Sequence, residues 1–304
     1  MPDPDPGPLV WITIDPDTPD DREKLTDGLR SLSAEDPTFR ADTKPETGQI
    51  VLTGMDELHL YGLIHHLLQE FGVKARIGTP TVRCFEGTRH AVTHTSKFKM
   101  AIDPTFVPSA VAIPDAEVTL SIWPTEPGEG GNFVSRVAGD TISEEFVAAI
   151  EKGVRIALSR GPRCGFPIAD VDVALLDASS SAEDPSALGF EKAARKCMRQ
   201  GLKKAGLIMF EPVMKVEIVT PEEKADSITG DVVNRRGRVL GRDTSVNPTV
   251  ITALVPLMNL FGYILSLRSM SSGRAEYTAV FDHWQPVPGD DGPDNFRPAI
   301  GKRA

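Results

Sequence analysis

The order of the elements predicted for the first quarter of the chain is the feature that most restricts its fold. Apolar residues alternate in short segments that predict strands, and they recur every three or four residues in two longer segments that predict helices. In chain order these are a strand at 9–14, a helix from about Pro19, strands at 38–43 and 49–53, a helix at 55–71 and a strand at 73–77. A series of strand, helix, two strands, helix and strand is that of the split βαβ sandwich.

Each of these two helices has a predicted apolar face. In the first helix, Leu25, Leu29 and Leu32 recur at spacings of four and three residues. In the second helix, the predicted stripe consists of Leu58, Tyr61, Ile64, Leu68 and Phe71. Such spacing is typical of helices that bury one side against a sheet.

The same order of elements returns near the C-terminus with a different sequence. Strands are predicted there at 212–219, 238–242, 249–255 and 276–283, with helices from Pro221 and at 257–267. The region between the two modules has strand-like segments at 89–95, 117–123 and 169–176, and helices at 143–159 and 186–205. The predicted domains are therefore 9–83, 84–210 and 211–288, between a flexible tail at 1–8 and a disordered tail at 289–304.

The composition excludes several classes of protein. The hydrophobic fraction of 40% and the charged fraction of 25% are those of a globular protein. The net charge of −10 argues against a dedicated duplex-DNA binder, whose domain is usually basic. Cys84, Cys164 and Cys197 form no CxxC pair, which predicts reduced thiols and a cytoplasmic location. No segment has the unbroken apolar length of a membrane span or the pattern of a signal sequence.

Motifs for chemistry are missing from the sequence. There is no GxxxxGK[ST] phosphate loop, and there is no HExxH, GxSxG or GxGxxG motif. Four histidines, at 65, 66, 90 and 94, have no cysteine or acid at a spacing that completes a tetrahedral metal site. We therefore predict that this chain is not an enzyme and has no catalytic residue, metal or cofactor.

One predicted helix is unusually basic. On the helix at 186–205, the residues Lys192, Arg195, Lys196, Arg199 and Lys203 share a face at spacings of three and four. Such a face is either simply solvated or a strip that contacts RNA or an acidic partner. We take Lys192 and Arg199 as candidate RNA contacts.

Many segments resemble bacterial elongation factor G, in the same order along the chain. AEDPTFR at 34–40, ETGQ at 46–49 and TGMDELHL at 53–60 resemble its domain III, and GPRCGFP at 161–167 resembles its domain IV. EPVMKVE at 211–217, TPEE at 220–223, NRRG at 234–237, FGY at 261–263, LRS at 267–269 and FDHW at 281–284 resemble its domain V. The resemblance covers roughly residues 8–288.

The resemblance implies a fold and a set of partners. The implied fold class is α+β, with two ferredoxin-like βαββαβ sandwiches flanking a ribosomal protein S5 domain 2-like domain. The family is a five-domain translational GTPase, so a G domain with GTP and Mg²⁺, and a domain II, would precede residue 1. The implied partners are the ribosome, through its RNA and proteins, and the G domain and domain II, with no membrane and no DNA. We expect an excised fragment of such a factor, and the alternative is a relative whose gene encodes no GTPase.

Both loops that form the tip of domain IV in the family differ here. The family's first tip loop is a glycine-rich run of the GGRGQYGHV kind, whereas residues 103–114 contain three prolines and no glycine. In the second loop, at 176–190, Ser180 and Ser181 stand where the family has tyrosine and histidine. We take Ser179, Ser180 and Ser181 as candidate contacts. The two interpretations are drift in a surface loop, or a divergent paralogue with an altered translocation step.

The resemblance also implies site residues in domains V and III. The segment with Arg268, Ser269, Ser272 and Arg274 would lie near the sarcin–ricin loop of ribosomal RNA. Arg235 and Arg236, with Arg238 and Arg242, form a second basic patch, unless they pair within the domain with Asp226, Asp231 and Glu223. Asp56, Glu57 and His59 are candidates for coupling to the G domain, and the alternative is a purely structural role.

Three functions remain in competition. The first is a ribosome-binding module that acts in translation elongation, in translocation, when joined to its G domain. The second is a GTPase-less or divergent paralogue that recycles, protects or regulates ribosomes. The third, a standalone enzyme, has no nucleophile and base in its favour.

Overall fold

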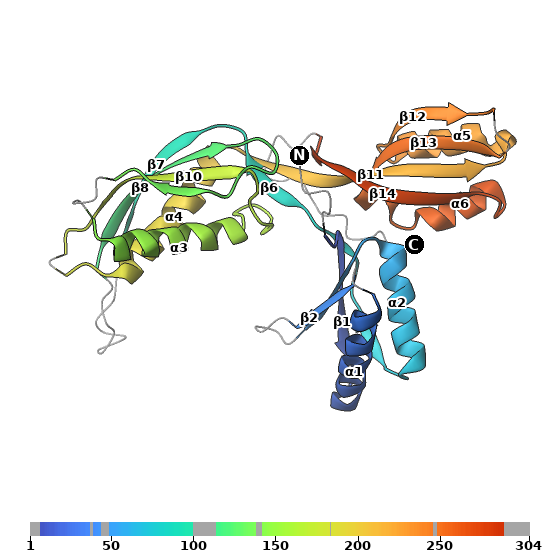
Figure 1. The fold of residues 1–304 in the computed structure, drawn as a ribbon, viewed down its shortest axis with the longest axis horizontal. Coiled ribbons are helices and arrows are strands. Elements are labelled where there is room, and N and C mark those ends of the chain that lie inside the picture. Colours follow the sequence, from blue (N-terminus) through green and yellow to red (C-terminus); the bar gives the residue numbers. More distant parts are fainter. Residues whose placement is uncertain are drawn as a thin grey trace. The chain divides into compact units, whose positions relative to one another are not determined.

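The computed structural model describes residues 7–36, 39–43, 49–99, 114–137, 142–182, 184–245 and 248–288. These form two compact units (Figure 1). One unit consists mainly of Cys84–Phe210, and the other combines Asp3–Arg83 with Glu211–Gln285. The predicted tail at 289–304 lies outside the described residues, as do residues 1–6 of the N-terminal tail.

The N-terminal module has the predicted order of elements. These are β1 (Val10–Pro16), α1 (Pro19–Glu35), β2 (Arg40–Thr43), β3 (Ile50–Gly54), α2 (Glu57–Glu70), β4 (Ala75–Ile77) and the short β5 (Thr81–Val82). The antiparallel sheet has the strand order β2-β3-β1-β4, with β5 also paired to β1. Helix α1 begins where Thr18 accepts a hydrogen bond of 3.1 Å from the Asp21 amide, as N-cap residues do.

The two helices of this module differ in how well their faces could be predicted. Leu25, Leu29 and Leu32 of α1 are buried, as expected. On α2 the prediction was right for Ile64 but wrong for the rest of the buried face, which consists of Leu60, Ile64 and Leu67. Two residues of the predicted stripe, Leu58 and Tyr61, are 59% and 39% exposed. Helix α2 carries apolar residues on two sides, and periodicity alone does not tell which side meets the sheet.

The C-terminal module repeats this topology. Its elements are β11 (Leu207–Thr220), α5 (Glu222–Asn234), β12 (Arg238–Asp243), β13 (Thr249–Pro256), the 3₁₀ turn η1 (Leu257–Leu260), α6 (Tyr263–Ser271) and β14 (Glu276–Pro286). The strand order β12-β13-β11-β14 matches that of the N-terminal sheet. The prediction of a single helix at 257–267 was wrong, because Gly262 has φ +67° and separates η1 from α6. This left-handed conformation costs glycine little and other residues more.

The unit between them has a different architecture. Its elements are β6 (Phe85–Thr88), β7 (Val92–Phe98), β8 (Ala116–Pro124), β9 (Phe133–Ser135), α3 (Glu144–Ser159), β10 (Val171–Ser179) and α4 (Ala187–Lys204). The sheet order is β7-β8-β10-β9, and β9 and β10 are parallel. Strand β6 pairs instead with the start of β11. The short strands β6 and β9 were not predicted.

Helices α3 and α4 pack on each other and on the sheet of this unit (Figure 1). Their contact depends on Gly153, because a Cβ atom there would come within 2.4 Å of the Glu191 carbonyl oxygen. The core beneath them includes the fully buried Val154, Ala194 and Met198. The described structure therefore has the α+β class that the sequence indicates.

Candidate nucleic-acid interface

Helix α4 presents its cations to solvent because its opposite side fills the core. Ser186 caps the helix by accepting a 3.1 Å hydrogen bond from the Gly189 amide. From there the buried positions include Ala193, Cys197 and Leu202. The exposed residues of the last ten positions are Arg195, Lys196, Arg199, Gln200, Lys203 and Lys204. The basic face predicted from the sequence therefore exists.

Three lysine side chains of α4 contact residues of strand β7. The Lys196 Nζ atom donates to the Lys97 carbonyl oxygen at 2.8 Å. The Lys204 Nζ atom lies 3.2 Å from the His94 Nδ1 atom. The Lys192 Nζ atom lies over the Phe98 ring, 5.9 Å from its centroid. We call Lys192, Lys196 and Lys204 the inner row.

The remaining cations of α4 have no such engagement. The side chains of Arg195, Arg199 and Lys203 make no hydrogen bond or ion pair with any other residue in the described ranges. They are spaced four residues apart and follow one side of the helix, and we call them the outer row. The only acid on α4, Glu191, is bound to Lys152 at 2.9 Å. Within the described part of the chain, the outer row therefore remains a line of positive charge without a paired acid.

The second tip loop is folded onto its own domain. The Ser180 hydroxyl donates to the Asp115 carbonyl oxygen at 2.5 Å, and the Ser181 hydroxyl donates to the Asp115 carboxylate at 2.5 Å. Lys97 binds the same carboxylate at 2.7 Å, and Lys97 together with Ser181 lowers the pKa of Asp115. Ser179 is exposed at the end of β10. The first tip loop, apart from Pro114, lies outside the described residues.

The GPRCGFP segment at 161–167 has a structural partner that the sequence did not reveal. The fully buried Glu86 carboxylate accepts hydrogen bonds of 3.1, 2.8 and 3.0 Å from the successive amides of Arg163, Cys164 and Gly165. A Cβ atom at Gly161 would come within 2.3 Å of this carboxylate. Because the partners are 77 to 79 residues apart, no local pattern could have paired them.

The structure brings the four candidates of the C-terminal module together on one exposed turn. Arg268, Ser269, Ser272 and Arg274 are all exposed at the end of α6. Ser272 has φ +55°, and the following Gly273 amide donates to the Arg268 carbonyl oxygen at 2.7 Å. Arg274 pairs with Glu223 at 2.9 Å, a contact that the sequence did not predict. Arg268 makes no ion pair with a residue in the described part of the chain.

Arg235 and Arg236 are engaged within the C-terminal module. Arg235 donates to Asp231 at 2.7 Å, to the Asn259 carbonyl oxygen at 2.8 Å and to Ser266 at 2.9 Å. It also covers the Tyr263 ring, with 4.9 Å between the guanidinium and the ring centroid. Arg236 binds both oxygens of Glu211, which is 1% exposed. The intradomain pairing predicted for this patch is confirmed for Arg235 with Asp231.

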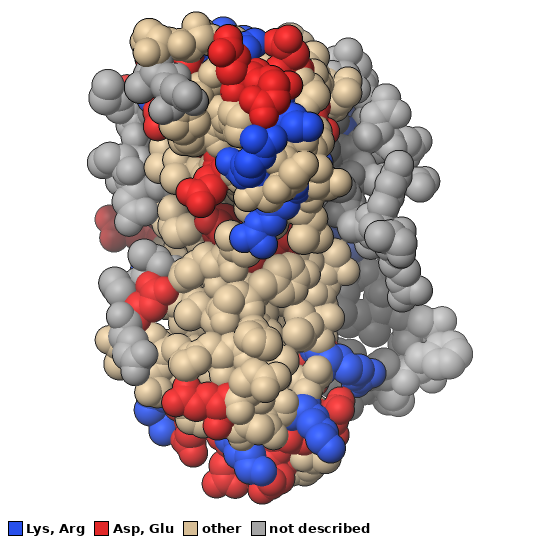
Figure 2. Space-filling view, turned by 90° about the vertical axis from the view of Figure 1, so that its right-hand side faces the viewer, with Lys and Arg blue, Asp and Glu red and all other residues tan. Residues whose placement is uncertain are grey.

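Arg242 follows the same pattern, since it binds Asp226 at 2.5 Å. The face shown in Figure 2, which looks onto the right-hand side of Figure 1, has Lys and Arg side chains interspersed with Asp and Glu in its upper part. A band of uncharged residues crosses the middle of that face. Cations that alternate with acids in this way leave little net field for a phosphate.

The three domain III candidates, Asp56, Glu57 and His59, form hydrogen bonds with residues of their own compact unit. Asp56 caps α2 by accepting a 2.8 Å hydrogen bond from the His59 amide, and the His59 Nε2 atom lies 2.7 Å from an Asp36 carboxylate oxygen. The Glu57 carboxylate accepts a 2.7 Å hydrogen bond from the Gly262 amide. Burial raises the pKa of Glu57, and this hydrogen bond opposes the rise. A hollow of about 500 Å³ beside Glu57 is lined by apolar residues that include Leu58, Tyr61 and Leu265.

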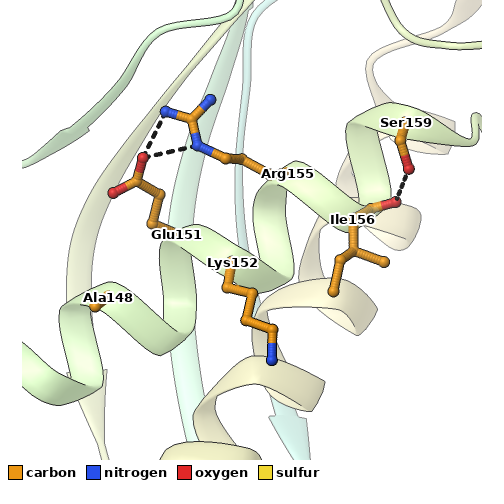
Figure 3. A pocket seen from close by; sticks show the side chains of 6 residues that line it. All are labelled: Ala148, Glu151, Lys152, Arg155, Ile156 and Ser159. Atoms are coloured by element: carbon orange, nitrogen blue, oxygen red, sulfur yellow. Dashed lines mark hydrogen bonds and ion pairs between the residues drawn. The ribbon is translucent and has the colours of Figure 1, made fainter.

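A shallow hollow on α3 is not a convergent site (Figure 3). Arg155 donates to Glu151 through its Nε atom at 2.8 Å and its second guanidinium nitrogen at 2.5 Å, so the two charges neutralise each other. Lys152 points away from this pair. Across the described ranges, no group of three or more His, Cys, Asp or Glu side chains could hold a metal ion. No described helix has the length and apolar character needed to cross a membrane.

Comparisons with known proteins match most of this chain. Three family models match in succession: Elongation Factor G, domain III at residues 6–79, Elongation factor G, domain IV at 95–206, and Elongation factor G C-terminus at 208–294. Elongation factor G of Dinoroseobacter shibae is 48% identical over 283 residues, and that of Ruegeria pomeroyi is 47% identical. Each alignment covers 93% of this chain and 39% of the relative, so the chain spans about two fifths of these relatives' length.

A solved structure agrees with the sequence comparisons. A crystal structure of a protein from Thermus thermophilus superimposes with a TM-score of 0.68 and 28% sequence identity. The superposition covers 93% of this chain and 41% of that protein. The likeness therefore extends over the N-terminal module, the central unit and the C-terminal module in one series.

Proposed function

The chain belongs to the elongation factor G family, and from that premise we propose that it is a ribosome-binding module that acts in translation elongation when joined to a G domain. The observation that carries the proposal is the succession of the domain III, domain IV and C-terminal matches in order along one chain. The exposed cations on α4 and on the turn after α6 supply groups that bind phosphates. The proposed location is the cytoplasm, where the ribosome is the partner.

GTP chemistry belongs to another part of such a factor. The 304 residues contain no GxxxxGK[ST] loop, so the backbone cradle and lysine that hold nucleotide phosphates and Mg²⁺ in such GTPases are missing from this sequence. We assign GTP and Mg²⁺ to a G domain, and we assign no catalytic residue to this chain. The G domain and domain II are the proposed intramolecular partners.

The proposed role of this chain is to position and to bind. Arg268, Ser269 and Ser272 offer hydrogen-bond donors at an exposed turn, and Arg274 shares its charge with Glu223. Phosphate contacts of this kind fix orientation without reading sequence. Asp56, Glu57 and His59 would maintain the shape of the domain III surface that couples to a G domain, through the cap and contacts described above.

A second candidate function is a paralogue with an altered or absent translocation step, acting in ribosome recycling, protection or regulation. The observation in its favour is that the Ser180 and Ser181 hydroxyls both donate hydrogen bonds to Asp115. A serine in this position neither stacks on a base nor carries charge. Replacing Ser181 with His, together with a glycine-rich first loop, should raise translocation in a full-length protein. Unchanged translocation after this graft would contradict the candidate.

The test of the main proposal is co-sedimentation of the purified chain with bacterial ribosomes at roughly 50 and 200 mM salt. Binding through phosphate contacts weakens strongly between these two concentrations. Authentic elongation factor G is the competitor. Binding that falls with salt and is displaced by the factor is the expected result. Binding that the factor leaves untouched, or no binding at the lower salt, would contradict a shared site.

A further inference from the structure

We propose that the outer row of α4, formed by Arg195, Arg199 and Lys203, binds the phosphate backbone of RNA, whereas the inner row only fastens the helix to β7. The source of that RNA, the ribosome, rests on the function proposed above. The division of labour itself rests on contacts. Lys196 and Lys204 are bound to β7 at 2.8 and 3.2 Å, and the outer row is bound to nothing in the described chain.

The spacing of the outer row suits a repeating anionic partner. Residues four apart on a helix are separated by about 6 Å along its axis, since each residue rises about 1.5 Å. Successive phosphates along a nucleic-acid strand are separated by a similar length. Long, unpaired Arg and Lys side chains can therefore each reach a different phosphate. Such contacts depend on the backbone and not on the base sequence.

The charge of α4 runs against the charge of the whole protein. The helix carries six cations, Lys192, Arg195, Lys196, Arg199, Lys203 and Lys204, against one acid, Glu191. Its net charge is thus +5 in a chain of net charge −10. Because Glu191 is paired with Lys152, no acid on the helix screens the outer row. A local basic stripe of this kind attracts anions even though the protein as a whole is acidic.

The chemistry of the exposed face favours RNA over an acidic protein. From Arg195 to Lys204, every exposed side chain is Arg, Lys or Gln. Protein interfaces concentrate their energy in buried aromatic and aliphatic anchors, and this stretch offers none. The exposed Leu188 lies two turns earlier, at the start of the helix. A purely electrostatic face fits a phosphate backbone, whose binding is electrostatic and sensitive to salt.

The test compares two variants that each remove three positive charges. The first is the full chain with R195A, R199A and K203A. The second, with K24A, R30A and R76A, removes three exposed cations of the N-terminal module, each near an acid at 2.8 to 3.9 Å. Thermal unfolding checks that both variants are folded. A third variant with R195K and R199K retains the charge of the outer row.

The readout is affinity for intact bacterial ribosomes and for protein-free ribosomal RNA, across a salt series. The logarithm of the binding constant falls linearly with the logarithm of the salt concentration, and losing three phosphate contacts should make this slope shallower by about 2–3. Between 50 and 200 mM salt, a fourfold change, the affinity of the parent should therefore fall by roughly 16- to 64-fold more than the affinity of the outer-row variant. The N-terminal control and the double lysine variant should keep the parent's slope.

The outcomes separate this inference from the proposed function. If the parent binds ribosomes and elongation factor G displaces it, but the outer-row variant has the same affinity and slope, the inference is wrong and the function stands. If the variant is weakened on ribosomes but unchanged on protein-free RNA, the row meets an acidic protein and the inference is also wrong. If the parent fails to bind ribosomes, the function is wrong. The slopes measured on free RNA then still support or overturn the role of the outer row.

Discussion

The C-terminal module and helix α4 both carry clusters of basic residues, and they use them in opposite ways. In the C-terminal module, the side chains of Arg235 and Arg236 bind carboxylates, a carbonyl, a hydroxyl and an aromatic ring of the same module. Arg195 and Arg199 of α4 project into solvent without a partner in the described chain. In the sequence both clusters look alike. The difference shows that a cation's availability depends on the acceptors that the fold brings near it.

The cause of the difference lies in where each cluster sits on its element. Arg235 follows the last turn of α5 and faces η1, where its guanidinium donates to the Asn259 carbonyl oxygen. Arg236 faces Glu211, a carboxylate buried on β11 that needs a cation. The outer row of α4 lies opposite the core, where no described acceptor approaches. Stability therefore depends on the first cluster, and the second is free for a partner.

The largest effect on stability is expected for Arg236→Ala. Among the described residues, the substitution leaves the buried Glu211 carboxylate with the 3.3 Å hydrogen bond from Gln285 as its one side-chain partner. Loss of one partner of a buried pair should lower the free energy of unfolding by about 2–3 kcal/mol, less than for a dry site because Arg236 is partly exposed. Urea unfolding measures the change. Adding Glu211→Gln should recover part of the loss, and a double variant less stable than Arg236→Ala would contradict the pairing.

A smaller loss is expected for Arg235→Ala. Three hydrogen bonds and the contact with the Tyr263 ring disappear, which should cost roughly 1.5–2.5 kcal/mol because the site is only partly buried. Arg235→Lys should not restore the parent's stability, since one ammonium cannot donate in the three directions of the guanidinium. If thermal unfolding shows that the lysine variant matches the parent, geometry is unimportant here and only charge counts.

The outer row of α4 should contribute almost nothing to stability. Alanine at Arg195, Arg199 and Lys203 removes no described contact and favours the helix, so the free energy of unfolding should change by less than about 0.5 kcal/mol. Guanidinium unfolding of the triple variant beside the parent tests this. A loss as large as that of Arg235→Ala would mean that the row has a structural partner, and the comparison between the two clusters would fail.

The sequence predicts those parts of the molecule whose partners are close along the chain. The repeated order of strands and helices and the buried face of α1 follow from local periodicity. The turn with Arg268, Ser269, Ser272 and Arg274 is likewise local, so its four candidates come together. The break of the 257–267 helix could have been suspected from Gly262, whose left-handed conformation ends η1 before α6 begins.

The remaining features depend on contacts between distant residues. Arg235 reaches acceptors 24 and 31 residues away, and Glu86 holds amides 77 to 79 residues away. No window along the chain contains both members of such a pair. The buried face of α2 was mispredicted for a related reason, because Leu58 and Tyr61 line a hollow shared with α6 and thus add a second apolar side to the helix. Periodicity gives the spacing of a stripe, and distant packing decides which stripe is buried.

The smallest effect concerns Glu57, a carboxylate whose partner among the described residues is a backbone amide. Burial raises its pKa in the folded state above the ordinary value of 4.5, so the folded protein binds this proton more tightly than the unfolded chain. Its contribution to stability is present below pH 4.5 and is lost as the pH rises through the folded pKa. Relative to the parent, Glu57→Gln should therefore gain stability with rising pH. Urea unfolding of both proteins at a series of pH values measures that difference.

Glu223→Gln is the matched control for this titration, because its sign is opposite. The pKa of Glu223 is lowered by its own backbone amide and by Arg274, so its contribution is present above 4.5 and is lost as the pH falls. The Glu223→Gln variant should thus lose stability relative to the parent as the pH rises, whereas Glu57→Gln gains it. If both variants change in the same direction, the Gly262 amide outweighs burial at Glu57. A backbone donor would then satisfy a buried carboxylate as effectively as the guanidinium of Arg236 satisfies Glu211.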